Sequence, residues 1–148
     1  MTAKEYLERP ERIVREIRRK QERIGTLKRL ATRFGPELSD IRVQTTHDPT
    51  KMQGFLADAA DEEKEIARLE EKLQEALCDS ARLIARLPDE KMARILEMRY
   101  LDRQMWEDIC ETMEAEMDTG RTRVFELHRI ALDILTPAPE TDDEENRQ

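Results

Sequence analysis

The chain has 148 residues, with 41% charged and 38% hydrophobic side chains and a formal net charge of −8 at pH 7. A chain of this length forms one ordinary domain or two very small ones, and its polarity excludes a thick globular core. Four glycines, six prolines and few aromatic residues are typical of long helices and not of sheets. We therefore expect an all-α fold made of thin helical layers.

The first part of the chain predicts two long helices. The first runs from about Pro10 to Phe34, and the second starts near Asp48-Pro49, a cap followed by a first-turn proline. Apolar residues three and four positions apart give each helix one seam. The seam residues are Ile13, Ile17, Ile24, Leu27, Ala31 and Phe34, then Met52, Phe55, Ala59, Ile66, Leu69, Leu73, Ala76, Leu83 and Leu87. We predict an antiparallel helical hairpin, or coiled coil, over residues 1–86.

The connection over residues 35–49 is long for two neighbouring helices, and such loops are usually mobile or functional. Its apolar pair Ile41 and Val43 could instead pack back on the hairpin as an anchor. The sequence leaves both alternatives open.

Each seam is interrupted once in its middle by a charged residue, Lys20 in the first helix and Glu62 in the second. We hypothesise that these two side chains pair and fix the register of the helices, as buried polar residues do in zippers.

The two helices carry opposite charge. Ten basic and three acidic residues lie between Arg9 and Arg33, whereas nine acidic and three basic residues lie between Asp58 and Asp79. An antiparallel pair brings some of these charges together. Arg12, Arg15 and Arg19 fall on the outer face of the first helix and are candidates for contact with phosphate groups or an acidic partner. The alternative is a solvated face that keeps the chain soluble.

Residues 87–135 predict three short helices with the breaks of a helix-turn-helix unit. Leu87-Pro88-Asp89 opens the first helix and Gly120 precedes the third. The apolar residues at helical spacing are Met92, Ile95 and Leu96, then Met105, Trp106, Ile109, Cys110 and Met113, and finally Val124, Leu127, Ala131 and Leu135. In this motif the last helix lies in the major groove, and here it begins with Thr119-Gly120-Arg121-Thr122-Arg123.

Several segments together indicate a family. They are Met1-Thr2-Ala3-Lys4-Glu5-Tyr6-Leu7, Ile41-Arg42-Val43-Gln44-Thr45-Thr46 with Lys51-Met52, Met98-Arg99-Tyr100-Leu101, and Trp106-Glu107-Asp108-Ile109-Cys110. In their order and spacing they resemble small phage and prophage proteins described as sigma-factor-region-four-like transcriptional regulators. The resemblance covers most of the chain. It aligns Leu87-Pro88, Arg99-Tyr100, residues 107–113 and Ala131-Leu132 with the sigma-factor segment.

This resemblance implies a DNA-binding activator of phage genes in the cytoplasm of a bacterial host, with double-stranded DNA and host RNA polymerase as partners. Nothing in the chain resembles the aromatic segment with which a sigma factor melts a promoter, so an accessory regulator is expected. Carried over by position, the residues facing DNA would be Thr119, Arg121, Thr122, Arg123 and Glu126, with Arg129 reaching phosphate.

Two features depart from the family pattern. The stretch between Met113 and Val124 is roughly four residues longer than the usual short turn, and nine acidic residues face five basic ones from Arg99 to Asp133. A net negative unit is repelled by DNA unless its cations are concentrated. In the alternative interpretation the last helix only packs a bundle, and Trp106, Phe125 and His128 extend its core or form a partner surface.

Three functions remain open at this point. The first is a DNA-binding regulator, which we expect to be a homodimer reading paired half-sites. The second is a coiled-coil interaction module without DNA binding, and the third is a phage DNA-packaging adaptor. No Gly-rich phosphate loop, metal-spaced His and Cys pair or activated nucleophile is evident, so we expect no enzyme, metal or cofactor.

The remaining expectations concern the ends of the chain and its cysteines. Cys78 and Cys110 lack ligand-spaced neighbours, and the amino-terminal residues contain no apolar signal core. This pattern favours a reduced cytosolic protein without a membrane span. Residues 136–148 are rich in proline and acids and predict a disordered acidic tail.

Overall fold

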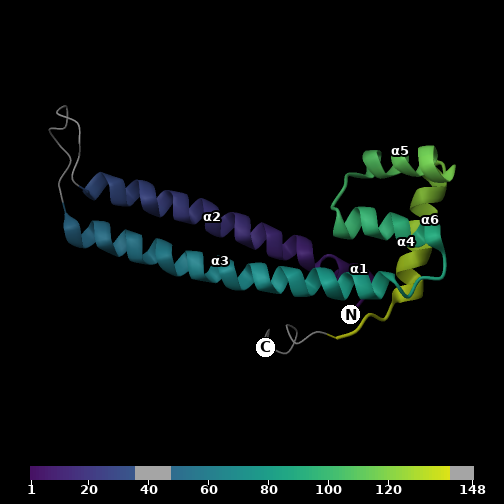
Figure 1. Cartoon of the computed structure of the whole chain (residues 1–148), viewed down its shortest axis with the longest axis horizontal. Coiled ribbons are helices and arrows are strands. Elements are labelled where there is room, and N and C mark those ends of the chain that lie inside the picture. Colours follow the sequence, from purple (N-terminus) through teal and green to yellow (C-terminus); the bar gives the residue numbers. More distant parts are fainter. Residues whose placement is uncertain (36–47, 141–148) are drawn as a thin grey trace. The chain divides into compact units, whose positions relative to one another are not determined.

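The computed structural model describes residues 1–35 and 48–140, and all regular secondary structure in these residues is helical (Figure 1). The elements are α1 (Ala3–Leu7), α2 (Arg9–Phe34), α3 (Pro49–Ile84), α4 (Glu90–Leu96), a π-helical turn η1 (Glu97–Leu101), α5 (Trp106–Met117) and α6 (Arg121–Leu135). The all-α prediction of a helical hairpin followed by a short-helix unit is confirmed. Residues 36–47 of the predicted loop, for which two interpretations were open, lie outside the described residues, as do the acidic residues 141–148.

Contacts divide the chain into two compact units. The first, here called the terminal unit, contains residues 1–12 and the described residues from 73 onward, and the second, the hairpin unit, contains Ile13–Lys72. The sequence-based division placed the boundary after residue 86 instead. Residues 73–86 continue the seam of α3 without a break, so the pattern of apolar residues contains no signal for a change of unit there.

The described part of the hairpin unit consists of α2 from Ile13 onward and α3 up to Lys72, which run antiparallel (Figure 1). Its buried core includes the cluster of Ile24, Leu27 and Ala59, against which Phe55 and Ile66 pack. Ile17, Ala31 and Leu69 are also buried in this unit. Near the end of the hairpin where α2 finishes and α3 begins, the rings of Phe34 and Phe55 stack with centroids 5.8 Å apart. At the start of α3, Asp48 Oδ1 accepts a hydrogen bond from the backbone N–H of Lys51, which makes Asp48 the expected cap.

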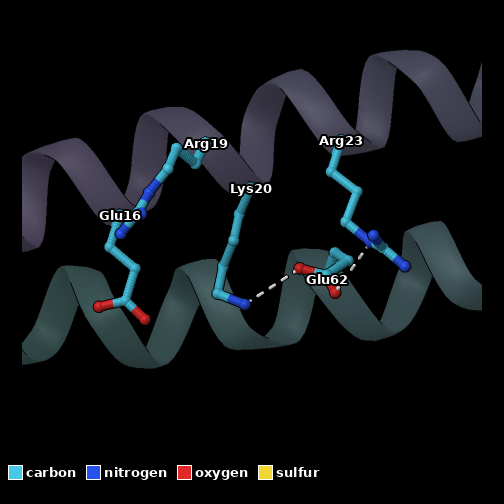
Figure 2. A pocket seen from close by; sticks show the side chains of 5 residues that line it. All are labelled: Glu16, Arg19, Lys20, Arg23 and Glu62. Atoms are coloured by element: carbon cyan, nitrogen blue, oxygen red, sulfur yellow. Dashed lines mark hydrogen bonds and ion pairs between the residues drawn. The ribbon is translucent and has the colours of Figure 1, made fainter.

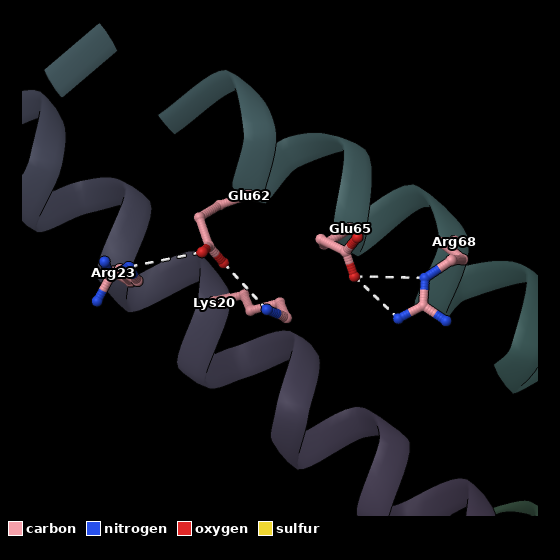
Figure 3. A network of polar contacts seen from close by, with 5 residues as sticks. All are labelled: Lys20, Arg23, Glu62, Glu65 and Arg68. Atoms are coloured by element: carbon pink, nitrogen blue, oxygen red, sulfur yellow. Dashed lines mark hydrogen bonds and ion pairs between the residues drawn. The ribbon is translucent and has the colours of Figure 1, made fainter. Parts of the chain in front are cut away.

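The two charged seam residues meet across the hairpin. Lys20 Nζ donates to Glu62 Oε2 at 3.1 Å, and Arg23 Nε lies 3.5 Å from Glu62 Oε1 (Figure 3). The Lys20 and Glu62 side chains are only 23% and 21% exposed. On the same side of α3, Arg68 donates two hydrogen bonds to Glu65 and lowers the pKa of that carboxyl. The hypothesised contact between Lys20 and Glu62 is therefore present.

Breaking this pair one side at a time is expected to cost more than removing both partners. Glu62→Leu leaves the half-buried Lys20 ammonium without its partner, and Lys20→Leu leaves Glu62 with only Arg23 of its two cations. Each variant should lower the free energy of unfolding by about 1–2 kcal/mol. The double variant should lose less than the sum, because the charge that then loses its partner is that of Arg23, whose side chain is 63% exposed. Urea unfolding of the four proteins gives the coupling energy. Additive losses, with an unchanged and unique hairpin in the double variant, would contradict a register role for the pair.

The core of the terminal unit lies among α4, η1, α5 and α6. Its fully buried side chains include Ile95, Leu96, Met98, Ile109, Met113, Val124 and Leu127. α4 begins after Asp89, whose Oδ1 accepts hydrogen bonds from the backbone N–H groups of Lys91 and Met92. The apolar residues predicted at helical spacing in this unit are buried or half-buried except Met105. Met105 is 69% exposed and is the extended residue that precedes α5.

The amino-terminal helix α1 is an element that sequence analysis missed. Thr2 and Glu5 form a reciprocal capping box, and Ala3, Tyr6 and Leu7 are buried in the terminal unit. The spacing Thr2-x-x-Glu5 ahead of an apolar pair is the signal that could have identified it.

Residues that follow α6 are bound to this amino-terminal segment. The backbone N–H of Ala3 donates to Thr136 Oγ1 at 3.0 Å, and that of Ala138 donates to the carbonyl of Met1 at 3.0 Å. Ala138 is 6% exposed. The prediction of a disordered tail is therefore wrong for residues 136–140, because a contact distant in sequence supplies backbone partners that local composition does not reveal.

In the parts of the chain that the structure describes, no helix is both long and apolar enough to cross a membrane.

Candidate nucleic-acid interface

α5 and α6 are joined by a turn of only three residues. α5 ends at Met117, and Asp118 adopts the left-handed conformation, with φ 50° and ψ 44°. The N–H groups of Asp118 and Thr119 both donate to the carbonyl of Met113, which closes the helix end. Gly120 is extended, and α6 begins at Arg121. Two short helices joined by three residues are typical of a helix-turn-helix motif.

The lengthened turn expected from the sequence does not form. Residues 114–117 continue α5 by about one turn, so the additional residues lengthen the helix and leave the connection short. Sequence analysis placed the end of the helix at Met113, the last buried residue of the stripe. The residues beyond it are exposed or half-buried and give no periodic apolar signal.

Thr119 is not available to a ligand, although it was predicted to face DNA. It is only 2% exposed, and its hydroxyl donates to the carbonyl of Met117 at 3.0 Å. The tight turn directs the side chain inward, where it satisfies a carbonyl at the end of α5. The prediction of a groove-facing Thr119 is wrong, and the residue stabilises the turn.

The other predicted residues of α6 lie on its exposed side. Val124, Leu127, Ala131 and Leu135 are buried on the opposite side of this helix. These predicted residues are Arg121, Thr122, Arg123, Glu126 and Arg129, and all of them are exposed. The first four lie within the first two turns, and Arg129 lies about two turns beyond Arg121. Basic and polar side chains are thus concentrated near the amino-terminal end of α6.

Two contacts orient the arginines of this end. Arg123 Nη1 lies 3.1 Å from Glu126 Oε1, and both side chains are about half exposed, at 55% and 46%. The guanidinium carbon of Arg121 lies 5.7 Å from the ring centroid of Phe125. Gly120 supplies no side-chain cap and the first turn contains no acidic residue, so the amino-terminal N–H groups of α6 remain available to an anion.

α5 carries the opposite charge. Its exposed carboxylates are Glu107, Asp108, Glu111, Glu114 and Glu116, and Asp118 follows in the turn. Two of these acids lie in the first turn of α5, where they favour the helix but repel a phosphate. The exposed surface of α5 therefore disfavours contact with phosphate groups, unlike the start of α6.

A group of aromatic side chains connects the beginning of α5 with α6. The Trp106 ring lies 4.9 Å from Phe125 and 4.7 Å from His128, measured between centroids, and the guanidinium of Arg99 lies 5.0 Å from the Trp106 centroid. Arg99 also donates to the carbonyl of Gln104. Sequence analysis left the roles of Trp106, Phe125 and His128 open. These contacts make them a structural support for the exposed side of α6, and Phe125 remains 37% exposed.

Tyr100, which is buried, and His128, which is half-buried, form a polar pair beside this group. Tyr100 Oη and His128 Nε2 are joined by a hydrogen bond of 2.8 Å. Burial lowers the pKa of His128 to about 4, and the charges of Arg99 and Lys4 act in the same direction. Burial raises the pKa of Tyr100 to about 12, with a further contribution from Glu8. Both side chains are therefore neutral at pH 7.

The free energy of unfolding should decrease as the pH falls below about 6.5, the pKa of an unfolded histidine. Below this pH the histidine of the unfolded state binds a proton, whereas His128 in the folded state does not bind one until about pH 4. We expect a loss of about 1 kcal/mol between pH 7.5 and pH 5, discounted for the partial exposure of the ring. Urea unfolding at both pH values measures it. The His128→Gln variant should lack this component, and an equal loss in that variant would contradict the assignment.

Three arginines of α2 were predicted as secondary contacts. Arg12 Nη2 donates to the carbonyl of Glu5 at 2.9 Å and so supports the end of α1. Arg15 and Arg19 are exposed and belong to the hairpin unit. Arg19 lines an open pocket together with Glu16, Lys20, Arg23 and Glu62 (Figure 2). Because Glu62 neutralises Lys20 and Arg23 there, this pocket is not a concentrated anion site.

Within residues 1–35 and 48–140, no group of three or more His, Cys, Asp or Glu side chains is arranged to hold a metal ion. Comparisons of the chain with protein-family models, with curated proteins and with solved structures find no match.

Proposed function

We propose that this chain is a DNA-binding regulator of transcription that reads double-stranded DNA with α6. The observation that carries the proposal is the three-residue connection between α5 and α6, followed by an exposed first turn with Arg121, Thr122 and Arg123. The opposite side of α6 is packed in the core, so the helix has one side available to a groove. The resemblance to phage regulators agrees with this geometry and suggests phage promoters or operators as the target and host RNA polymerase as a partner.

Each exposed side chain has a suitable role at a major groove. Arginine binds the O6 and N7 acceptors of guanine in a bidentate manner, and the methyl group of threonine contacts that of thymine. Arg121 and Thr122 are therefore the proposed base readers. Arg123 is held by Glu126 in the free protein, so it must exchange this ion pair for a base or phosphate. Arg129, farther along the helix, is proposed to contact phosphate.

The distribution of charge predicts modest affinity for DNA of arbitrary sequence. Non-specific binding depends on the number of phosphates neutralised, and only Arg121, Arg123 and Arg129 contribute on the exposed side of α6. The carboxylates of α5 oppose close contact elsewhere on the unit. Specific base contacts would therefore account for a larger share of binding than in a strongly basic protein, and the affinity should depend only moderately on salt.

Selection of genomic fragments tests the proposal directly. The purified chain is mixed with sheared DNA from the genome that encodes it, at two salt concentrations, and the retained fragments are sequenced. We expect a small set of promoter-proximal fragments that persists at the higher salt. Retention of no fragments, or of arbitrary fragments that disappear as salt rises, would contradict it.

A protein-interaction function without DNA is the second candidate, and the exposed carboxylates of α5 favour it because they suit a basic protein surface. The same selection of genomic fragments distinguishes the two candidate functions, since a protein-interaction module retains no DNA fragment. Retention of a single packaging site by a ring-shaped assembly would instead support the packaging adaptor.

A further inference from the structure

One flank of the hairpin unit is defined by two rows of residues at helical spacing. The row on α2 consists of Val14, Arg18, Gln21, Gly25 and Lys28, and the row on α3 consists of Leu56, Ala60, Glu63, Ala67 and Glu70. Lys28 Nζ lies 3.3 Å from Glu63 Oε1, which places both rows on the same side of the hairpin. We call this surface the docking flank.

The docking flank contains three small residues among its larger, mostly polar or charged side chains. Leu56 is 45% exposed, Ala60 and Ala67 are exposed, and Gly25 has no side chain. A β-carbon added at Gly25 would approach only the end of the flexible Arg29 side chain. The contacts of Glu62 with Lys20 and Arg23 involve no residue of these two rows (Figure 3). Another helix can therefore approach the docking flank at these small residues without displacing the Arg23–Glu62–Lys20 contacts, while the Lys28–Glu63 ion pair lies on the flank itself.

The core between α2 and α3 is thin. Its buried side chains are the cluster of Ile24, Leu27 and Ala59 together with Ile17, Ala31 and Leu69, and all of them lie along a single seam. Two helices joined along one seam leave their remaining apolar side chains in water, and Leu56 is the clearest case here. Four-helix bundles remove this exposure by adding a second pair of helices.

Charge indicates which molecule supplies the second pair. The α2 row contributes Arg18 and Lys28, and the α3 row contributes Glu63 and Glu70. A two-fold axis parallel to the helices places α2 of one copy against α3 of the other, antiparallel, so that both contacts join opposite charges. The other two-fold arrangement would place basic α2 on basic α2, which is unfavourable.

We propose that the docking flank binds a second copy of this chain, forming an antiparallel four-helix bundle in which basic α2 rows face acidic α3 rows. Phe34 of α2 stacks on Phe55 of α3, so these two residues lie level along the antiparallel helices. About the same distance toward the start of α2 and toward the end of α3 brings Arg18 level with Glu70. Each of these two residues is exposed and makes no ion pair with any other residue that the structure describes. They are paired between copies in the bundle.

The size of the flank suits a dimer of ordinary stability. A stretch of 22 residues of α2 from Ile13 to Phe34 is about 33 Å long, and two adjacent helices are about 20 Å wide. The flank thus presents on the order of 650 Å² per copy, near the lower range of specific interfaces. Micromolar affinity is the expected strength.

Sedimentation velocity of the full chain, without nucleic acid, tests the proposal. The unchanged protein should be a dimer at about 50 µM and dissociate on dilution, as expected for micromolar affinity. Ala60→Arg with Ala67→Arg adds bulk and positive charge opposite the basic α2 row and should give a monomer. Ala57→Arg is the matched control, because Ala57 is also an exposed alanine of α3 but does not belong to the flank. It should remain dimeric.

Mixing two charge-reversed variants gives a stricter test. Arg18→Glu alone and Glu70→Lys alone each create like-charged contacts at both symmetric positions and should weaken the dimer at least tenfold. In an equal mixture, glutamate at 18 of one chain faces lysine at 70 of the other, while the second contact keeps its original charges. The mixture should therefore form a heterodimer.

Several results would overturn the proposal: a monomeric unchanged protein, equal behaviour of the Ala60/Ala67 and Ala57 variants, or no recovery on mixing. Circular dichroism of each variant verifies that the helices are retained, and all substituted side chains are exposed. These measurements contain no DNA, so a failure here leaves the proposed DNA-binding function to its own test.

Discussion

Replacing Arg121 and Arg123 together by alanine is expected to weaken binding to a selected promoter fragment by about 100-fold. A bidentate contact between arginine and guanine contributes about 1–3 kcal/mol of discrimination, and a tenfold change in affinity corresponds to about 1.4 kcal/mol. Both side chains are exposed at the start of α6 and neither belongs to the core, so helical content and thermal stability should be retained. Fluorescence anisotropy with a labelled fragment at fixed salt measures the loss.

The matched control removes the same charge elsewhere. Arg82 and Arg86 are exposed arginines near the end of α3, in the same compact unit, and Arg82 has a side chain that is 82% exposed. Arg82→Ala with Arg86→Ala should reduce the affinity less than threefold, as expected for a small change in long-range attraction. Equal losses in the two double variants would mean that only net charge matters, and α6 would not be the reading helix.

Truncation of Ile109 should produce the second large effect, on stability. Ile109 lies on α5 with none of its side chain exposed and belongs to the main core cluster. Ile109→Ala removes buried methyl and methylene groups and leaves a cavity, which costs about 2–5 kcal/mol. Against a total stability of about 5–15 kcal/mol, this loss should shift the urea midpoint strongly. Denaturation followed by circular dichroism measures it.

Ile134 provides the comparison for this substitution. It is an isoleucine of α6, but its side chain is 50% exposed. Ile134→Ala should change the free energy of unfolding by less than about 1 kcal/mol, because exposed sites are mostly neutral. If both alanine variants unfold at the same urea concentration, the packing of α5 against α4 and α6 is not as described.

The elements that sequence analysis predicted correctly are those with local signals. Asp48-Pro49 marks the start of α3, and Gly120 immediately precedes α6. The alternating three and four spacing identified both seams of the hairpin, including the charged residues Lys20 and Glu62 that meet across it. Each of these features depends on residues within a turn or on the helical repeat, and both are visible in a single chain.

The predictions that failed depended on tertiary contacts or on turn geometry. The burial of Thr119 follows from the left-handed conformation at Asp118, which neighbouring residue types alone do not specify. The order of residues 136–140 depends on Met1 and Ala3, at the opposite end of the chain. The aromatic support of α6 joins Arg99, Trp106 and His128 from three elements, and helical spacing within one element cannot reveal it.

The hydrogen bond between Ala3 and Thr136 has a consequence for how the protein is made. The terminal unit contains both ends of the described chain, whereas the hairpin unit is one continuous stretch between them. On the ribosome, residues 13–72 emerge together and can pair their helices at once, since neighbouring segments close quickly. Met1 and Ala3 must wait until Thr136 and Ala138 have been synthesised. Translation therefore imposes an order in which the hairpin forms first and the terminal unit is completed last.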